Sequence, residues 1–503
     1  MTPSRRQFCT AMLLAPAAVT ITSSARSGVG SVSVREFGAT GDGKNDDTEA
    51  FRRATLSGSD LFIPATANFY RLSRTIALAR AGQRIYGEGE RSRIVQTGQG
   101  SNSDVFVAQF DDCHFANLHL TPGTETTVLA NGWGIAVLDA RGVTISSCYF
   151  SGMRRGGVML SNAVECLIAG NSFTESVVRG DGSEPQSQTG FDIYLTGSAS
   201  RNRVRGNNCM SGVGVGIGCQ TSPGRSQEGN VIADNRIANQ PAYGIMIYRG
   251  GVGDTIYRVV IERNVVRNIS GAIYTDGKTR FYGCGIYVAS ANHFSVIDNR
   301  VTNTNTDRNL PFSGSGVPAG IGISGYGDGL VRGNEIEGCY DGIASIQTLE
   351  PEVGDKTIIE NNIVRRCDHT GVLLLDSVGA AVRGNHLIGT PGSSQGIYAA
   401  HVAASHRGNL SITENAVEGF GVGIEVRERL PFADISGNRV SGNLGHAIYA
   451  APEELRITGN TVSGIAISAQ AGRGIVRDNV IGERGIQDGT RGRISSSRNR
   501  RSP

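Results

Sequence analysis

The stretch LVRGNEIEGCYDGIASI, residues 330–346, contains the unit from which most of this chain is built. Its first half has the form apolar-x-x-Asn-x-apolar around Asn334, and its second half, from Gly342, has the form Gly-apolar-x-apolar. Apolar residues that alternate over such short runs, between glycine-rich turns, are typical of short β-strands. The stretch therefore predicts two or three very short strands joined by turns.

The Asn-containing segment recurs through the chain at spacings of 19 to 36 residues. A repeat of this length that contains only strands and turns is typical of one coil of a parallel β-helix. Coils stack about 4.8 Å apart, so equivalent asparagines can form a ladder of side-chain amides. We therefore expect an all-β, single-stranded parallel β-helix of about twelve to fourteen coils. The ladder residues are Asn171, Asn207, Asn235, Asn264, Asn299, Asn334, Asn362, Asn385, Asn415, Asn438, Asn460 and Asn479.

The segment SVREFGATGDGKNDDTEAFRRA, residues 33–54, differs from the repeats. Asp46 and Glu49 have the spacing of a capping box, which predicts a helix that starts near Asp47 and turns Ala50, Phe51 and Ala54 to one side. The end of a β-helix exposes an unpaired apolar coil and requires a cover. We therefore expect a short N-terminal helical cap over residues 26–60, followed by the β-helix over 61–483.

The two ends of the chain are distinct in composition. Residues 4–25, SRRQFCTAMLLAPAAVTITSSA, resemble a twin-arginine export signal, with cleavage after Ala25. This resemblance implies a signal peptide over residues 1–25, the twin-arginine export machinery as a partner and a periplasmic or secreted location. Residues 484–503 are rich in Arg and poor in apolar residues, and we expect a disordered basic tail there. The formal net charge of +3 implies no nucleic-acid partner, and we expect no stable membrane insertion.

The segment at residues 33–54 is similar to the N-terminal signature of pectate-lyase-like right-handed β-helix proteins, apolar-x-x-Phe-Gly-Ala-x-Gly-Asp-Gly-x-x-Asp-Asp-Thr. That superfamily includes polygalacturonase-like hydrolases, lyases, epimerases and phage tailspikes, so the resemblance implies a right-handed fold and no single reaction. Together with the twin-arginine start, the chain resembles the twin-arginine-translocated repeat proteins, whose function is unassigned.

The cysteines indicate no metal site. Eight follow the signal, and none has the CxxC spacing of a zinc site. Cys339 and Cys367 each lie five residues after a ladder asparagine, so we expect them in adjacent coils, close enough for a thiol stack or a disulfide. No cofactor is assigned. Ca²⁺ is left open, although the calcium motifs of pectate lyases are not visible.

By analogy with β-helix enzymes, we expect the substrate groove along the sheet formed by the Gly-apolar-x-apolar strands. Tyr194, Tyr287 and Tyr398 are candidate sugar platforms on the outward side of these strands, and Tyr282 is a fourth, in a loop at the edge. The predicted outward column is Ala136, Met159, Tyr194, Gly216, Met246, Tyr287, Gly322, Ala344, Leu373, Tyr398, Glu425 and Tyr449.

Three long insertions, at residues 174–190, 266–283 and 301–320, precede these strands and should project from one edge. The segment YTDGKTRFYG, residues 274–283, offers Asp276, Lys278 and Arg280 as candidate catalytic residues. A lyase needs a base and cations that stabilise the resulting anion, whereas a glycosidase needs two carboxyl groups.

Asp192 and His369 complete the candidate catalytic residues. Gly190-Phe191-Asp192 matches part of the aromatic-Gly-Phe-Asp-Pro-His stretch of alginate-type epimerases, and Asp192 opens a groove strand. His369 lies in the turn before another groove strand, where it could act as an acid or base. The hydrolase motifs Asn-Thr-Asp, Asp-Asp and Gly-His-Gly are present at best as fragments.

These observations predict action on an envelope or extracellular, acidic polysaccharide. A lyase or epimerase is favoured and a glycoside hydrolase is next. The alternative is a non-catalytic protein that binds glycan or acts as an envelope scaffold. The oligomeric state is left open.

Overall fold

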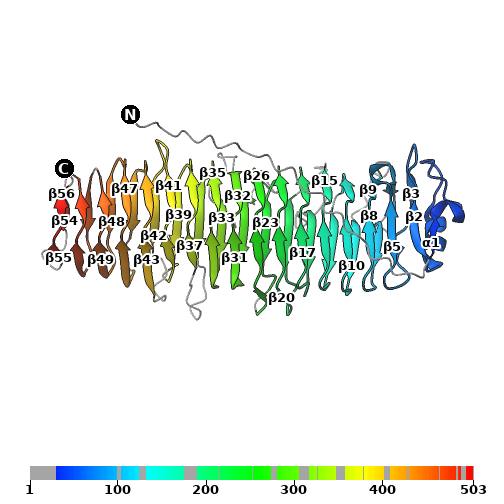
Figure 1. Ribbon diagram of the computed structural model, residues 1–503, viewed down its shortest axis with the longest axis horizontal. Coiled ribbons are helices and arrows are strands. Elements are labelled where there is room, and N and C mark those ends of the chain that lie inside the picture. The colour runs from blue at the N-terminus through cyan, green and yellow to red at the C-terminus, as the bar shows by residue number, and fades with distance from the viewer. Residues whose placement is uncertain are drawn as a thin grey trace, which may run out of the picture.

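The computed structural model is an elongated right-handed parallel β-helix with a helix at its N-terminal end, as expected (Figure 1). The three long sheets run the length of the molecule, and the colour sequence in Figure 1 passes along the axis without reversal. The described residues are 30–98, 103–123, 132–153, 155–174, 190–212, 214–251, 253–273, 280–281, 283–304, 317–325, 327–346, 357–377, 379–400, 408–427, 430–463, 465–482, 485–488 and 494–501.

Each full coil contributes one strand to each of three sheets, in the order first, second, third. The first sheet has 18 strands in the described chain, more than the number of coils expected from the ladder asparagines alone. It contains β1 (Ser31–Ser33), β2 (Asp60–Ile63), β5 (Arg84–Gly87), β8 (His114–Ala116), β11 (Thr144–Ser146), β14 (Leu167–Ala169), β17 (Arg203–Arg205), β21 (Val231–Ala233), β25 (Val260–Glu262), β31 (Phe294–Ile297), β34 (Gly329–Arg332), β37 (Ile358–Glu360), β40 (Ala381–Arg383), β43 (Asn409–Thr413), β46 (Phe432–Ser436), β49 (Glu454–Thr458), β52 (Arg473–Arg477) and β55 (Ile494–Ser497).

The second sheet follows the ladder asparagines. It contains β3 (Tyr70–Leu72), β6 (Arg93–Gln96), β9 (His119–Pro122), β12 (Tyr149–Ser151), β15 (Ser172–Thr174), β18 (Asn208–Met210), β22 (Arg236–Ala238), β26 (Val265–Ile269), β32 (Arg300–Thr304), β35 (Glu335–Glu337), β38 (Ile363–Arg365), β41 (His386–Ile388), β44 (Ala416–Glu418), β47 (Arg439–Ser441), β50 (Thr461–Val462), β53 (Val480–Ile481) and β56 (Arg500–Arg501).

The third sheet is formed by the Gly-apolar-x-apolar segments. It contains β4 (Ile76–Ala77), β7 (Phe106–Ala108), β10 (Trp133–Leu138), β13 (Gly156–Ser161), β16 (Phe191–Thr196), β19 (Val215–Gln220), β23 (Tyr243–Tyr248), β29 (Cys284–Ala289), β33 (Ala319–Ser324), β36 (Asp341–Ile346), β39 (Thr370–Leu375), β42 (Gln395–Ala400), β45 (Val422–Val426), β48 (His446–Ala450), β51 (Ile465–Ala469) and β54 (Ile486–Asp488). Two small additions are a parallel sheet of β20 (Ser226–Glu228), β24 (Thr255–Tyr257) and β30 (Ala291–Asn292), and an antiparallel pair of β27 (Ala272–Ile273) and β28 (Arg280–Phe281).

The asparagine ladder forms between the first and second sheets, as the repeat predicts. Asn334 Oδ1 accepts hydrogen bonds from the backbone N–H and the Nδ2 of Asn299, at 2.9 and 3.0 Å. Asn334 Nδ2 donates in turn to Asn362 Oδ1 and to the carbonyl of Val296, both at 2.9 Å. Because the ladder residues are buried and a buried amide without partners is costly, this pairing fixes the height of each coil on the next.

The residue before each ladder asparagine is in the left-handed conformation, which explains the Gly-Asn and Asp-Asn pairs of the repeat. Glycine fills less than half of these positions, so the ladder holds side chains in a conformation that costs them roughly 1–2 kcal/mol. The residues are Gly170, Gly206, Asp234, Arg263, Asp298, Gly333, Asn361, Gly384, Glu414, Gly437, Gly459, Asp478 and Arg498.

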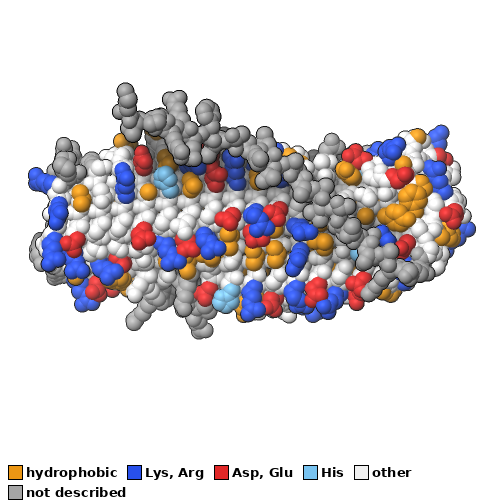
Figure 2. Space-filling view, in the orientation of Figure 1, with side chains coloured by type: hydrophobic (Ala, Val, Ile, Leu, Met, Phe, Trp, Pro, Cys, Tyr) orange, Lys and Arg blue, Asp and Glu red, His pale blue; other side chains and the backbone are white. Residues whose placement is uncertain are grey.

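Inward-facing Ile, Val, Leu and Phe side chains of the three sheets form one continuous core along the axis. Arginine and carboxylate side chains of successive coils pair on the surface of the first sheet and its turns, for example Arg263 with Asp234 at 2.8 Å and Arg383 with Glu360 at 2.5 Å. Figure 2 shows such basic and acidic side chains next to one another along the molecule. Pairs that are exposed on both sides, such as Arg263 with Asp234, contribute only about 0–1 kcal/mol each.

The N-terminal cap consists of β1, a 3-10 helix η1 (Val34–Phe37) and α1 (Thr48–Leu56), which turns Ala50, Phe51 and Ala54 into the core as expected. The expected capping box of Asp46 and Glu49 is wrong. Glu49 pairs with Arg52, while the Asp46 carboxylate accepts hydrogen bonds from Thr48. The capping box in this segment belongs to η1, where Ser33 and Glu36 bond reciprocally.

The expected disordered tail at residues 484–503 is also different in the structure, because β54, β55 and β56 add a further coil there. The reason is a thirteenth ladder residue: Asn499 Oδ1 accepts hydrogen bonds from the backbone N–H and Nδ2 of Asn479 at 3.0 Å. Its segment, SSSRNRR, has no apolar residues around the asparagine, which hides the repeat. Among the described residues no helix is long and apolar enough to cross a membrane.

All eight cysteines of the described chain are free and buried. Cys339 and Cys367 lie in adjacent coils as expected, but they form no disulfide. Side chains stacked in register on parallel strands lie about 4.8 Å apart, whereas the two Cβ atoms of a disulfide approach to about 3.8 Å. Burial raises the pKa of the Cys339 thiol to about 11 and that of Cys148 to about 12.

The ladder predicts that the loss of stability on removing an asparagine depends on where along the ladder that asparagine lies. Replacing Asn334 by Ala leaves the backbone N–H of Asn299 buried without its acceptor and removes the hydrogen bond to the carbonyl of Val296, so we expect a loss of at least about 2 kcal/mol of unfolding free energy. Asn499→Ala, at the half-buried end of the same ladder, should cost less than about 1 kcal/mol. Urea unfolding measures both, and equal losses would contradict the ladder as the main stabilising contact.

Candidate functional site

The outer face of the third sheet presents a column of side chains that stand in register across its strands. The predicted column is correct except at one position: Gly218, and not Gly216, stands opposite Tyr194 and Met246. The register error arises because glycine recurs at 212, 214, 216 and 218, so the Gly-apolar-x-apolar pattern fits two registers there. Strands of this sheet also turn two consecutive residues inward near their start, such as Gly342 and Ile343.

The first of these inward positions is occupied by glycine in most coils, because a side chain has no room there. A Cβ on Gly342 would lie 2.3 Å from Val364 Cγ1 and 2.5 Å from the carbonyl of Gly371. Asp192 occupies this position opposite Gly216, and Ala447 occupies it in β48.

Asp192 therefore does not reach the groove, contrary to the sequence-based expectation. It is 2% exposed, and its Oδ2 accepts a hydrogen bond of 2.8 Å from Gln240 Nε2. Burial, followed by the charge of Asp192, holds the pKa of the core thiol of Cys209 well above its usual range. This environment makes Asp192 part of the interior and not of a substrate site.

Several other candidates cannot be placed at the site. Asp276, Lys278 and Tyr282 lie outside the described residues, as do most of the three insertions. Arg280 begins β28, which pairs with β27, but its side chain is outside the description as well.

The candidate sugar platforms differ in exposure. Tyr194 is half-buried and stacks on Phe191 and Trp133, with ring centroids 4.2 and 5.9 Å apart. Tyr287 is only 8% exposed and stacks on Tyr243 at 5.2 Å within a second apolar cluster on this face. Tyr398 is half-buried and stands in register with Glu425. Tyr194 and Tyr398 are thus partly exposed, although the Tyr194 ring is stacked on two other rings, whereas Tyr287 is mainly packed.

His369 has the most developed surroundings of the predicted catalytic residues. Its Nδ1 lies 2.9 Å from Asp341 Oδ1, and the same carboxylate oxygen accepts the backbone N–H of Thr370 at 3.1 Å. The imidazole stacks on Tyr340, the equivalent residue of the previous coil, with centroids 5.0 Å apart. The side chain of His369 is 39% exposed and that of Asp341 is 3% exposed.

This geometry fixes the role of each nitrogen. An ionised carboxylate accepts hydrogen bonds only, so Nδ1 of His369 carries the proton and Nε2 is the basic position. Asp341 raises the pKa of His369 above its ordinary value of 6.5, mainly through this hydrogen bond. Burial raises the pKa of Asp341 itself, and the hydrogen bond from His369 opposes that shift.

Sequence reasoning missed Asp341, although a signal was present. Alignment of the glycine position of successive groove strands, Gly342 and Gly371, puts Asp341 in register with Thr370 and next to His369. The acidic residue directly before this glycine is therefore visible in the sequence once the column is recognised.

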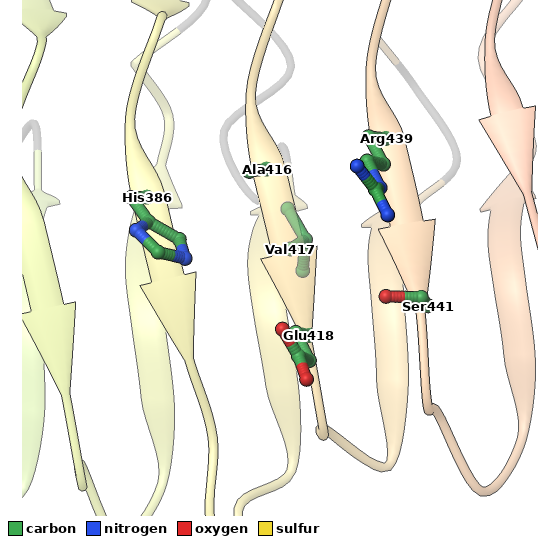
Figure 3. Close-up of a pocket in the computed structure, with 6 residues that line it drawn as sticks. All are labelled: His386, Ala416, Val417, Glu418, Arg439 and Ser441. Atoms are coloured by element: carbon green, nitrogen blue, oxygen red, sulfur yellow. The ribbon is translucent and has the colours of Figure 1, made fainter. Parts of the chain in front are cut away.

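A hollow of about 430 Å³ lies on the second sheet and not on the groove face. Figure 3 shows His386, Glu418 and Arg439 on the neighbouring strands β41, β44 and β47 that line it. It is open to solvent and separate from His369. Among the described residues no group of three His, Cys, Asp or Glu side chains is arranged to hold a metal ion.

The chain matches the family model described as right handed beta helix region over residues 95–284 and 278–417. No curated protein sequence matches it. Similar solved structures include the catalytic unit of a GH87 alpha-1,3-glucanase from Streptomyces thermodiastaticus, with 13% identity, a TM-score of 0.45 and coverage of 95% of this chain and 69% of that one.

Two further similar structures are DFA-IIIase from Arthrobacter chlorophenolicus A6 and the A-module of the mannuronan C-5 epimerase AlgE4 from Azotobacter vinelandii. Both are 13% identical to this chain, with TM-scores of 0.47 and 0.44. Each aligns with 72% of this chain and with 94% and 99% of its own length, respectively. At this level of similarity they say nothing about the chemistry of the site.

The His369–Asp341 pair predicts a specific titration. NMR of the histidine side chains should give His369 a pKa above 6.5, and Asp341→Asn should lower it, because the hydrogen bond to a carboxylate is lost. Because the folded pKa is raised, the stabilisation from this pair is complete below pH 6.5 and is lost as pH rises through the folded pKa. An unchanged titration in Asp341→Asn would contradict the pair. The NMR titration of His386, which lies on the second sheet, serves as the control, because a change there as well would mean that the variant alters the protein in general.

Proposed function

We propose that this chain, which belongs to the right handed beta helix region family, acts on a linear acidic polysaccharide as a lyase or epimerase. The observation that carries the proposal is the half-exposed imidazole of His369, held by the buried Asp341 on the outer face of the third sheet. A base that is oriented in this way and partly exposed is suited to proton abstraction.

The chemistry assigns one step to His369 in both reactions. Neutral Nε2 takes the proton from the carbon that bears the sugar carboxylate, and the electron pair is delocalised into that carboxylate. In a lyase the pair then forms a carbon–carbon double bond as the glycosidic C–O bond breaks, and the leaving oxygen takes up a proton. In an epimerase a proton returns to the same carbon from the opposite face.

Hydrolysis has less support from the described side chains. On the described strands of the third sheet from β10 to β51, two carboxyl groups belong to the outer face, those of Asp341 and Glu425. Their strands, β36 and β45, are three strand spacings apart, which is about 14 Å. Glycosidases hold their two carboxyl groups about 5–9.5 Å apart, so this pair does not match them.

The shape of the face supports a polymer as the ligand. Sixteen parallel strands give an uninterrupted surface about 70 Å long, far longer than a single sugar. Half-buried Tyr194 and Tyr398 stand in the same column of this surface, and the Tyr398 ring can stack on a sugar ring.

A non-catalytic glycan-binding protein is the second candidate. It is favoured by the packing of Tyr287, Tyr243 and Cys284 into a second apolar cluster on this face. Binding without turnover of any uronate polymer would support it.

We propose in addition that the twin arginines direct the chain to the periplasm or the medium. Cell fractionation after replacement of Arg5 and Arg6 by Lys tests this step. Retention of the protein inside the cell is expected, and unchanged export would contradict it.

Turnover is tested with a panel of uronate polymers, with the absorbance of unsaturated products for a lyase and sugar configuration by NMR for an epimerase. We expect activity from the wild type and a loss of about 10²–10⁴-fold in His369→Gln, because a general base contributes about that much. The rate should rise with pH through a limb above 6.5, since only neutral His369 accepts the proton.

The matched control is His386→Gln, a histidine on the second sheet, which should retain full activity. Equal activity of the His369→Gln variant and the wild type would contradict the assignment of His369 as the base.

A further inference from the structure

The polar part of the outer face continues beyond His369 into a second group of side chains, which we name the Arg427 cluster. It consists of Gln395, Glu425, Arg427, His446 and Tyr449, from β42, β45, the turn after β45, and β48. The backbone N–H of Ser394, next to Gln395, donates to the carbonyl of His369 at 2.8 Å, so the cluster begins in the coil adjacent to His369.

Glu425 forms the centre of the cluster and is fully engaged. Its carboxylate is 5% exposed, although it stands in the outward column between Tyr398 and Tyr449. Oε2 accepts a hydrogen bond of 3.0 Å from Gln395 Nε2, and Oε1 lies 2.6 Å from a terminal nitrogen of Arg427. A buried carboxylate with a partner on each oxygen holds that arginine in one place.

Tyr449 fixes the plane of the same guanidinium. Arg427 Cζ lies 5.6 Å from the centroid of the Tyr449 ring, at a distance typical of a cation–π contact. The Arg427 side chain is nevertheless 51% exposed. A guanidinium has five N–H donors in a rigid fork, and an arginine held by a carboxylate and a ring is prepared to bind a second carboxylate in two-point contact.

His446 adds a further polar group to the cluster, and one of its ring nitrogens has no hydrogen-bond partner among the described residues. His446 Nδ1 is buried, and among the described residues it makes no hydrogen bond, while its ring lies 6.0 Å from that of Tyr449. Buried polar atoms are nearly always paired in folded proteins, and a group that lacks a partner on a face that binds ligand is commonly satisfied by the ligand.

The cluster lies where a bound polymer would pass. β45 is two strand spacings from β39, so Arg427 is about 10 Å from His369 along the axis. Arg427 also lies across the sheet from His369, because it pairs with Glu425, which stands in register with Leu373, four residues after His369. A polymer that crosses the third sheet obliquely from His369 would therefore reach Arg427 with a sugar further along its chain.

We propose that Arg427 binds the carboxylate of a sugar further along the polymer than the reacting one, and so makes the face selective for uronate polymers over neutral ones. This inference rests on the proposed function. Glu425 and Tyr449 position the guanidinium, and His446 Nδ1 hydrogen-bonds the same sugar.

The test compares two ligands and two variants by calorimetric titration. The ligands are short oligouronates and the same oligosaccharides with their carboxyl groups reduced to alcohols. All variants carry His369→Gln, so that the ligand is not consumed. Arg427→Gln is compared with Arg456→Gln, because Arg456 has the same exposure of 51% and also pairs with a carboxylate, Asp434, but lies on the first sheet.

We expect the parent protein, which carries His369→Gln alone, to bind the oligouronate at least about tenfold more tightly than the reduced oligosaccharide. Arg427→Gln should abolish this preference, and Arg456→Gln should keep it. Thermal unfolding of both variants confirms that the fold is intact.

Each other outcome overturns a distinct statement. If the oligouronate binds and Arg427→Gln leaves the preference unchanged, the role of Arg427 is wrong while the proposed function stands. If Arg427→Gln weakens both ligands equally, Arg427 binds hydroxyl groups and not a carboxylate. If the parent binds neither ligand, the acidic-polysaccharide function itself fails.

Discussion

The hydrogen bonds of the buried asparagine ladder are the constraint on which the rest of this structure depends. Each amide accepts the backbone N–H of the previous coil and donates to the next, so coils can stack at one height and in one register only. The ladder also holds Asp234, Arg263 and Glu414 in left-handed conformations that a free chain would avoid. With the register fixed at this turn, every outward position of the third sheet faces its equivalent in the next coil.

That register creates the candidate site. Asp341 and His369 are 28 residues apart in the chain, yet the stacking of their coils brings the carboxylate to 2.9 Å from the imidazole. Burial raises the pKa of Asp341, and the hydrogen bond from His369 opposes that shift. The same hydrogen bond raises the pKa of His369 and orients its ring. The same stacking aligns Gln395, Glu425 and Arg427 further along the face. A repetitive scaffold can therefore produce a specific polar site from single departures in otherwise apolar columns.

The fold was predictable from the sequence because the ladder is a local pattern: Asn with an apolar residue on each side recurs whenever a coil closes. Asn499 was not recognised as a ladder residue because polar residues replace its apolar neighbours, and the last coil was therefore expected to be disordered. On the groove face, Gly218 was missed because alternating glycines at 212–218 fit the pattern in two registers, and Asp192 was misplaced for a different reason. A strict two-residue alternation does not describe a strand that turns two consecutive residues inward. His369 could be identified by residue type and position, whereas Asp341 required the exact stacking of two coils. The insertions that carry Asp276 and Lys278 follow no repeat, so neither period nor register constrains them.

The central claim is that His369 removes a proton from the carbon beside a sugar carboxylate. The most direct measurement uses uronate polymers that carry deuterium at that carbon, and follows the release of the label into water. Release detects both a lyase and an epimerase. We predict release by the wild type and its loss in His369→Gln. A polymer that binds the wild type, but retains its label, would contradict the claim and identify a binding protein.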